Sequence, residues 1–235
     1  MLVEVFSDIA CPWCYIGKTR FERALARYEH ADEVEVVWRS FQLAPDAPVE
    51  APGLTVDHLA EKYRVSRERA LEMMRQVTEV AASEGLEFHL ERAVAANTFD
   101  AHRVTHLAAA RGLGRPVMER LMRAYQSEGE NVADRETLAR LAAEADLPAE
   151  DVRATLASGA YADAVEADLE RARRYGVSGV PFFVFDASAA VSGAQPTELF
   201  LSALRQLGPQ RPALRVLEGA EDAACGPDGC EVRPG

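Results

Sequence analysis

The spacing of apolar positions changes twice along the chain, and it predicts two α/β segments on either side of a long helical one. The N-terminal segment is predicted to form a strand over 2–7, a helix over 12–29 and a strand over 34–41. The C-terminal segment is predicted to form strands over 182–186 and 189–192 and a helix over 196–207. Between them, apolar residues recur at helical spacing almost throughout 55–160.

Cap and breaker residues divide the middle segment into separate helices. Pro45, Pro48 and Pro52 mark a linker before it. Ser66 and Asp134 are expected to be N-caps, because a short polar side chain there accepts a hydrogen bond from the first turn. The predicted helices are 67–84, 99–111, 116–127, 135–146, a short one from Pro148, and 161–175.

Two cysteines follow the first predicted strand, in the sequence Cys11-Pro12-Trp13-Cys14. Proline suits the first position of a helix, because its φ is helical and its missing N–H would have no partner there anyway. A helix that opens at Pro12 makes Cys11 its N-cap, where free N–H groups and the helix dipole favour a thiolate. Cys14 then lies one turn inside. The spacing predicts Cys11 as an exposed nucleophile and Cys14 as the resolving thiol of a disulfide exchange.

The same Cys-x-x-Cys pair is also half of a zinc site. Such a site usually needs a second pair of Cys or His within about 12–20 residues. The next histidine is His30 and the next cysteine is Cys225. Redox chemistry is therefore the favoured interpretation, and no metal site is predicted, although adventitious zinc or another soft metal on the thiols stays possible.

A second motif, Gly179-Val180-Pro181-Phe182-Phe183, opens the first C-terminal strand. Proline cannot donate to a strand ladder, so it belongs at the strand start. A cis Val180–Pro181 bond would turn the Val180 backbone outward, free to pair with an extended peptide. Most bonds before proline are trans, so position alone leaves both isomers open.

Together these motifs resemble the thioredoxin superfamily, and within it the DsbA-like branch that includes the FrnE proteins. The matching stretches are Ser7 to Gly17, Trp38 to Leu43, Asn97 to Arg103, Gly179 to Phe183 and Ser192 to Pro196. The resemblance implies an α/β thioredoxin fold with an inserted all-helical domain, a catalytic Cys11 and Cys14, and a cis Pro181. The expected domains are a discontinuous thioredoxin-like domain (1–45 and 176–207), a helical insertion (46–175) and a flexible C-terminal tail (208–235).

Five further residues are expected to bind substrate. Trp13 and Tyr15 flank the thiols, Val180 and Phe182 flank Pro181, and His102 falls in a stretch that matches the family. For His102, packing or simple solvation is the alternative.

Two other residues near the thiols call for an explanation. Asp8 precedes Cys11 by three positions, so it either shuttles a proton for Cys14 or caps a turn at the strand end. Gly17 lies inside a predicted helix, where glycine costs about 1 kcal/mol relative to alanine. Close approach of another backbone is the simplest reason for a glycine there.

Composition and charge narrow the location and the partners. The net charge of −12 argues against nucleic acid as a partner, and no apolar run approaches the length of a membrane span. The first strand begins at Leu2 with no hydrophobic leader before it, so we expect a cytoplasmic protein. In a reducing cytosol, its 4 cysteines point to catalysis, redox sensing or metal binding rather than to structural disulfides.

The pattern ends after Leu207, and the tail carries a second pair, Cys225 and Cys230, around a Gly-Pro-Asp-Gly turn. The 17 residues between Leu207 and Cys225 span on the order of 55–60 Å when extended. A disulfide in so short a loop would stabilise the fold by only about 2 kcal/mol. We therefore expect a regulatory redox pair that exchanges electrons with Cys11 and Cys14.

These features favour a protein dithiol-disulfide oxidoreductase or isomerase, with no cofactor beyond its redox-active disulfides. Its expected partners are protein thiol or disulfide clients and a small-thiol or thioredoxin-type reductant. One alternative is a metal-binding or redox-sensing protein that uses all 4 thiols. Another is a glutathione-dependent isomerase or transferase of small aromatic substrates. Kappa-class glutathione transferases and hydroxychromene-carboxylate isomerases share this scaffold but use a serine near the position of Cys11, and this chain keeps both cysteines there.

Overall fold

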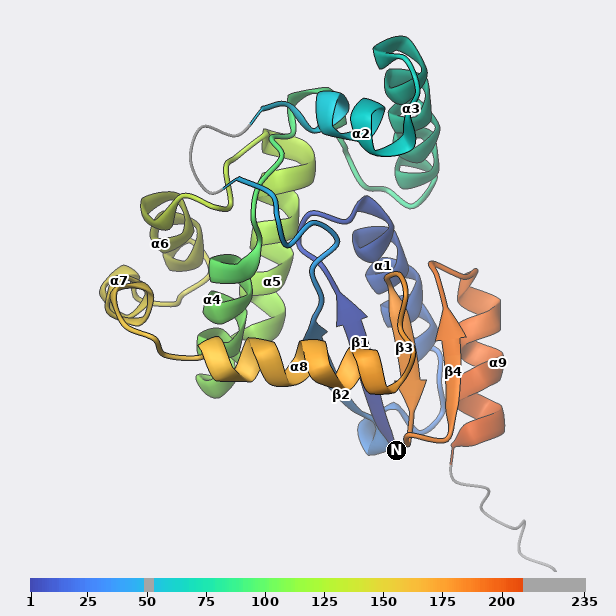
Figure 1. Ribbon diagram of the computed structural model, residues 1–235. Coiled ribbons are helices and arrows are strands. Elements are labelled where there is room, and N and C mark those ends of the chain that lie inside the picture. The colour runs from blue at the N-terminus through green and yellow to red at the C-terminus, as the bar shows by residue number, and fades with distance from the viewer. Residues whose placement is uncertain (49–52, 209–235) are drawn as a thin grey trace, which may run out of the picture.

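Figure 1 shows the computed structural model, which describes residues 1–48 and 53–208. Its regular elements, in chain order, are β1 (Leu2–Ser7), α1 (Pro12–Ala26), β2 (Glu35–Ser40), α2 (Thr55–Tyr63), α3 (Arg67–Ser83), α4 (Phe99–Ala110), α5 (Gly114–Arg123), the π-helix η3 (Ala124–Glu128), α6 (Arg135–Ala143), α7 (Ala149–Ala157), α8 (Ala162–Arg174), β3 (Phe182–Phe185), β4 (Ala189–Ser192) and α9 (Thr197–Leu207), with 3-10 turns at Ala31–Glu33 and Leu90–Arg92.

The strands form one sheet of order β2-β1-β3-β4. β1 and β2 are parallel, and α1 makes the crossover between them. β3 is antiparallel to β1, and β4 is antiparallel to β3. This is the expected thioredoxin arrangement, with α2 to α7 inserted between β2 and α8.

Alternation along β1 sends its side chains to two layers, because successive residues of a strand face opposite sides of the sheet. Val3 and Val5 pack against Phe21 of α1 and residues of α9. Phe6 packs in a separate cluster with Ala172 of α8. Figure 1 shows the result, with α8 crossing one face of the sheet and α1 and α9 covering the other.

The helical insertion follows the predicted pattern closely but not at every boundary. Ser66 caps α3 by accepting a hydrogen bond from the Arg69 N–H (3.2 Å), and Asp134 caps α6 in the same way. The helix predicted over 116–127 changes to the π-helix η3 after Arg123. Helix α2 (Thr55–Tyr63) lies within the predicted helical region, but the sequence pattern does not mark its ends.

The largest apolar cluster joins the insertion to the start of α1. Cys11, Cys14, Tyr15 and Ile16 belong to the same cluster as buried residues of α3, α4 and α5. The thiols therefore lie in the seam between the sheet and the inserted helices. In the part of the chain that the structure describes, no helix is long and apolar enough to cross a membrane.

Candidate active site

The two thiols are placed by the start of α1. Cys11 is its N-cap with Pro12 at the next position, and the Cys14 N–H donates to the Cys11 carbonyl (3.1 Å). Both are free cysteines. Cys14 is fully buried, as expected for a resolving thiol, but Cys11 is only 3% exposed. The predicted open exposure of Cys11 is therefore wrong, because the cleft walls, which include α2 and α3, stand over the start of α1.

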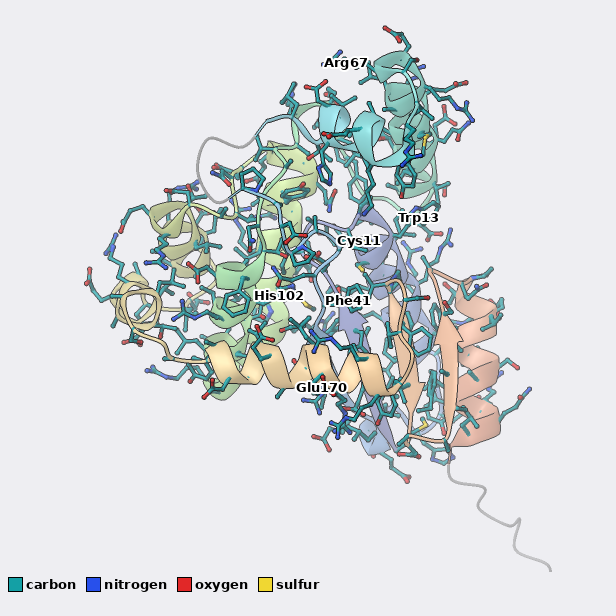
Figure 2. All side chains as sticks on the ribbon, in the orientation of Figure 1. Cys11, Trp13, Phe41, Arg67, His102 and Glu170 are labelled. Carbon is teal, nitrogen blue, oxygen red and sulfur yellow. The ribbon has the colours of Figure 1, made fainter. Side chains whose placement is uncertain are left out.

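Cys11 instead opens onto a cleft of about 520 Å³ between α1, the Val180 loop and the α2–α3 pair. Trp13 is 40% exposed and lines this cleft together with Val180. Leu59, Met73 and Met74 contribute an apolar wall. Figure 2 shows Cys11 and Trp13 beneath α2 and α3, at the upper end of α1. Cys11 and Trp13 thus line the same cleft.

Pro181 lies against α1 beside the thiols. The Val180–Pro181 bond is cis, as the family resemblance implied. The Cys11 thiol lies 3.6 Å from the Val180 carbonyl oxygen, to which it donates. A Cβ on Gly17 would stand 2.8 Å from the Pro181 Cγ and 3.4 Å from the Ala194 Cα. Close approach is thus the reason for glycine, although the nearest atom belongs to the Pro181 ring rather than to a backbone.

Cys14 is held in its protonated form. Burial raises the pKa of the Cys14 thiol well above its ordinary value, and the adjacent Cys11 sulfur raises it further. The Asp8 main chain and the nearby Ser7 hydroxyl lower the pKa of Cys14 but do not outweigh these effects. Cys14 is therefore a neutral thiol in this structure.

The Asp8 carboxylate caps the loops around the thiols. It is buried and accepts from the Leu43 N–H (2.8 Å) and, more weakly, the Ala10 N–H (3.4 Å). His102 Nε2 lies 3.4 Å from the same carboxylate and 2.9 Å from the Phe41 carbonyl oxygen. Because a carbonyl oxygen only accepts, Nε2 carries the proton. Of the two roles weighed for Asp8, the structure shows the capping one.

Three predicted substrate-binding residues lie off the cleft wall. His102 is 3% exposed and sits behind Asp8, on the α4 side in Figure 2. Tyr15 is buried and packs on Phe88, with ring centroids 5.9 Å apart. Phe182 packs beside the cluster of Phe6 and α8. These positions give the three side chains packing contacts, whereas Trp13 and Val180 line the cleft. Substrate binding by these residues stays a prediction.

Two cleft residues come from η3 and were not anticipated. The Tyr125 hydroxyl shares a hydrogen bond with Thr55 Oγ1 (2.9 Å), and burial raises the pKa of Tyr125 to about 12, with the charges of Asp8 and Cys11 adding to it. Gln126 is fully buried and its amide N–H donates to the Ile9 carbonyl oxygen (3.2 Å). In a helix predicted to run to 127, nothing in the sequence marks either residue as part of a site.

Metal ligands are not gathered anywhere in residues 1–48 and 53–208, where no group of three His, Cys, Asp or Glu side chains could hold an ion. The predicted tail pair, Cys225 and Cys230, lies outside the described residues.

Comparison with known proteins identifies the family. Residues 2–205 match the model of the DSBA-like thioredoxin domain. The structure of a probable DsbA oxidoreductase from Streptomyces coelicolor is 45% identical to this chain, with a TM-score of 0.85 and all of both chains covered.

Two more distant structures show the fold alone. The cytosolic disulfide reductase DsbM from Pseudomonas aeruginosa, solved with glutathione, is 23% identical, with a TM-score of 0.61 over 88% of this chain and 99% of that one. A 2-hydroxychromene-2-carboxylate isomerase is 15% identical, with a TM-score of 0.65 over 88% and 96%. On the family match over nearly its whole length and the thiols beside Pro181, this chain belongs to the DsbA-like thioredoxin-domain family of thiol-disulfide oxidoreductases.

Proposed function

We propose that the protein is a protein dithiol-disulfide oxidoreductase with isomerase capacity, and that Cys11 and Cys14 perform the exchange. One observation carries the proposal: the Cys11 sulfur opens onto the cleft 3.6 Å from the Val180 carbonyl, with a protonated Cys14 one turn behind it. A pair with one reachable and one sheltered thiol suits a two-step exchange.

In the reducing direction, the Cys11 thiolate attacks a client disulfide, forms a mixed disulfide and releases one client thiolate. Cys14 then attacks the Cys11 sulfur, and the client leaves as a second thiol. The client has gained two electrons and two protons, and Cys11 and Cys14, which supplied them, are left as an oxidised disulfide. The reverse sequence oxidises a client. If a second client thiol resolves the mixed disulfide, the net result is isomerisation.

The proposed clients are protein segments in extended conformation. The apolar cleft wall formed by Leu59, Met73 and Met74 supports a protein client, because the unbranched side chain of methionine adapts to varied apolar side chains. Trp13 adds an exposed aromatic surface next to Cys11. A small-thiol or thioredoxin-type reductant would recycle the pair, and we place the reaction in the cytoplasm without nucleic acid or membrane as a partner.

The C-terminal pair is part of the proposal as a regulator. Cys225 and Cys230 sit among Glu221, Asp222 and Asp228, whose charges disfavour a thiolate. Cys11, at a helix N-terminus, is then the better leaving group of a mixed disulfide between the two sites. The active-site disulfide is expected to oxidise the tail pair and leave Cys11 reduced, which suits isomerisation.

The roles of the thiols are tested by Cys11→Ser and Cys14→Ser in insulin reduction and in trapping of thiol-reactive client proteins. Cys11→Ser should abolish exchange, and Cys14→Ser should accumulate mixed disulfides on Cys11. Trapping on Cys14 instead, or full activity of Cys11→Ser, would contradict the proposal. Glutathione-dependent turnover of a small aromatic substrate that survives Cys14→Ser would favour the transferase alternative.

The tail is tested separately with the full-length double variant Cys225→Ser/Cys230→Ser. We expect altered reductase and isomerase rates and an altered resting redox state of Cys11. Thiol titration with and without zinc is the companion measurement, since one metal masking all 4 thiols would favour the metal-binding alternative. Unchanged rates and redox state would show that the pair takes no part.

A further inference from the structure

Ser7, the last residue of β1, has a buried hydroxyl without a hydrogen-bond partner among the described residues. The residue is 3% exposed, and its Oγ makes no hydrogen bond to any part of the chain that the structure describes. A buried hydroxyl that has lost its water partners and gained none is unfavourable, and most such groups in proteins are paired. The hydroxyl calls for a partner in some other state of the site.

The position of Ser7 indicates which group that partner is. Alternation along β1 puts it on the same face as Val3 and Val5, the face that α1 covers. There the Ser7 hydroxyl lies near the Cys14 thiol, where donation to the sulfur lowers the pKa of Cys14 and so favours the thiolate form. The main-chain hydrogen bond from Asp8 reaches the same sulfur with the same effect.

We propose that the Ser7 hydroxyl and the Asp8 N–H form a donor pair that stabilises negative charge on the Cys14 sulfur during exchange, which makes Ser7 a catalytic residue. The inference deepens the proposed function and rests on it. A donor that forms its hydrogen bond only when charge develops on the Cys14 sulfur stabilises the transition state and not the resting state. An interaction of this kind lowers the activation barrier and so accelerates the reaction.

In the reducing direction, Cys14 loses its proton, and its sulfur attacks the Cys11 sulfur of the mixed disulfide. The Cys11–Cys14 bond forms, the bond from Cys11 to the client sulfur breaks, and the departing client sulfur takes up the proton. Ser7 keeps its own proton and only donates a hydrogen bond. In the oxidising direction Cys14 is the leaving thiolate, and the same pair of donors receives it.

Other donors near Cys14 are already engaged or excluded. Cys14 is fully buried, so bulk water does not solvate a charge on its sulfur. The Asp8 carboxylate accepts from the Leu43 and Ala10 N–H groups, and a carboxylate has no proton to donate. Among the described side chains that touch the Cys14 thiol, the Ser7 hydroxyl supplies the neutral O–H donor.

The expected size of the effect follows from the chemistry of thiols. Loss of a hydrogen bond to a charged group lowers the thiolate fraction by about 10- to 100-fold. The thiolate that remains is intrinsically more nucleophilic, with a Brønsted coefficient of about 0.4–0.5, which offsets roughly half of that loss on a logarithmic scale. Ser7→Ala should therefore slow resolution by about 3- to 10-fold.

The experiment separates the two chemical steps in one trace. Cys225→Ser/Cys230→Ser serves as the full-length parent, so that only the active-site thiols react. The reduced protein is mixed with 5,5′-dithiobis(2-nitrobenzoate) at pH 7 in a stopped-flow instrument. The first release of thionitrobenzoate reports attack by Cys11, and the second reports resolution by Cys14. The Cys14→Ser variant of the parent should lose the second phase, and this loss assigns the second phase to Cys14.

Ser7→Ala should slow the second phase by about 3- to 10-fold and leave the first phase unchanged. Oxidation of a dithiol peptide by the disulfide form should slow by the same factor. The midpoint against glutathione at pH 7 should not move, because the reduced resting state is a neutral thiol in both proteins. Thermal stability should be equal or higher, since the change removes an unpaired buried hydroxyl.

Ser40→Ala is the matched control. Ser40 is also 3% exposed and pairs with Ser7 across β1 and β2, but its hydroxyl is bonded to His106 Nε2 (3.1 Å). This variant should lose some stability and keep both phases at the parent rates. An equal second phase in Ser7→Ala, a shifted midpoint or an equal slowing of both phases would overturn the inference. Absence of the second phase in the parent itself would instead overturn the proposed function.

Discussion

β1 carries two buried polar side chains whose surroundings are opposite in kind. Glu4 lies under α8 and is fully paired: Arg39 (2.8 Å), Arg171 (2.9 Å) and Tyr175 (3.2 Å) all donate to its carboxylate. Ser7 lies at the strand end beside Cys14 and is paired with none of the described residues. The paired group has its interactions in every state of the molecule, whereas the unpaired one has an interaction to make when charge appears next to it. The first is a structural device and the second belongs to the chemistry.

The region around Glu4 extends into a cluster whose composition could be mistaken for a hydrolase site. Ser40 Oγ and the Asp168 carboxylate both contact His106, each at 3.1 Å. Both contacts are made through the same nitrogen, Nε2. A proton relay from serine to histidine needs one ring nitrogen for the serine and the other for the acid. These residues therefore fasten β2, α4 and α8 together and do not form a nucleophilic triad.

The largest effect on stability is expected from Glu4→Gln. This change leaves Arg39 and Arg171 close together without the carboxylate that pairs them. Loss of one partner of a buried ion pair costs about 3 kcal/mol at the lower end of the usual range, which fits here because both guanidinium groups are partly exposed. Urea unfolding at pH 7 measures it, and stopped-flow thiol exchange should stay at the parent rates. A large change in exchange would break the distinction between the two regions.

The same region predicts how stability depends on pH. Burial would raise the pKa of Glu4, but hydrogen bonds from Arg171 and Arg39 outweigh it and lower the pKa below its ordinary value. For Asp168, burial acts the same way and the hydrogen bonds from His106 and the Ser40 N–H outweigh it. A carboxyl with a lower pKa in the folded state gives stability that is complete above its unfolded pKa and is lost as the pH falls through the folded one. Wild-type stability should therefore drop below about pH 4, and Glu4→Gln should show a shallower drop.

Gly17→Ala should have the next largest effect, and it should act on the thiol region. The added Cβ would meet the Pro181 ring at 2.8 Å, so either α1 or the Pro181 loop must shift. The strain outweighs the gain of about 1 kcal/mol in helix propensity, for a net loss of about 1–2 kcal/mol. Thermal unfolding and both phases of thiol release check this. An increase in stability with normal exchange would show that the loop gives way freely.

Tyr125→Phe is expected to cost about 1 kcal/mol, because it removes the hydrogen bond to Thr55 in the cleft floor. The two hydroxyls are hydrogen-bonded to each other and not to the reacting sulfurs. Both phases of thiol release should therefore be unchanged, while the KM for a peptide disulfide that fills the cleft should rise. An altered second phase would extend the catalytic region to η3.

The smallest change in stability is expected from Ser7→Ala, which should leave the free energy of unfolding equal or raise it by up to about 1 kcal/mol. The two variants on opposite faces of β1 should therefore differ in kind. Glu4→Gln should lower the stability and leave thiol exchange unchanged, whereas Ser7→Ala should slow the second phase of thiol release and leave the stability unchanged or higher. A loss of more than about 1 kcal/mol would mean that the Ser7 hydroxyl is paired in the resting protein.

Much of the fold follows from local signals. The alternation of Val3 and Val5, the proline at Pro12 and the cap at Ser66 each act within one strand or one turn, so the element and its start could be predicted without knowing its neighbours. The order of the elements then restricts the topology, since a parallel β1–β2 pair needs a crossover helix. The glycine at position 17 also indicates that another part of the chain approaches α1 closely, but the sequence does not show that this part is Pro181.

Other features depend on residues far apart in the sequence. The burial of Cys11 is set by α2, α3 and the Val180 loop, which come together only in the folded chain, so its predicted exposure failed. The change to a π-helix at Ala124 brings Tyr125 and Gln126 to the cleft, and no local pattern marks it. His102 was predicted at the substrate surface and lies instead behind Asp8.

Local signals are enough to predict the reactive dithiol, its division into an N-cap thiol and a thiol one turn inside, and the strand and helix that carry them, because these features rest on interactions within a few residues. Which groups lie next to the sulfurs depends on contacts that form only in the folded chain. The alternation that places Val3 and Val5 in the core also directs Ser7 toward α1. The packing of α1 against β1 then brings the Ser7 hydroxyl near Cys14, where it has no hydrogen-bond partner among the described residues. Groups such as Ser7 and Cys14 come together only through tertiary packing, and these contacts set the chemistry of the site.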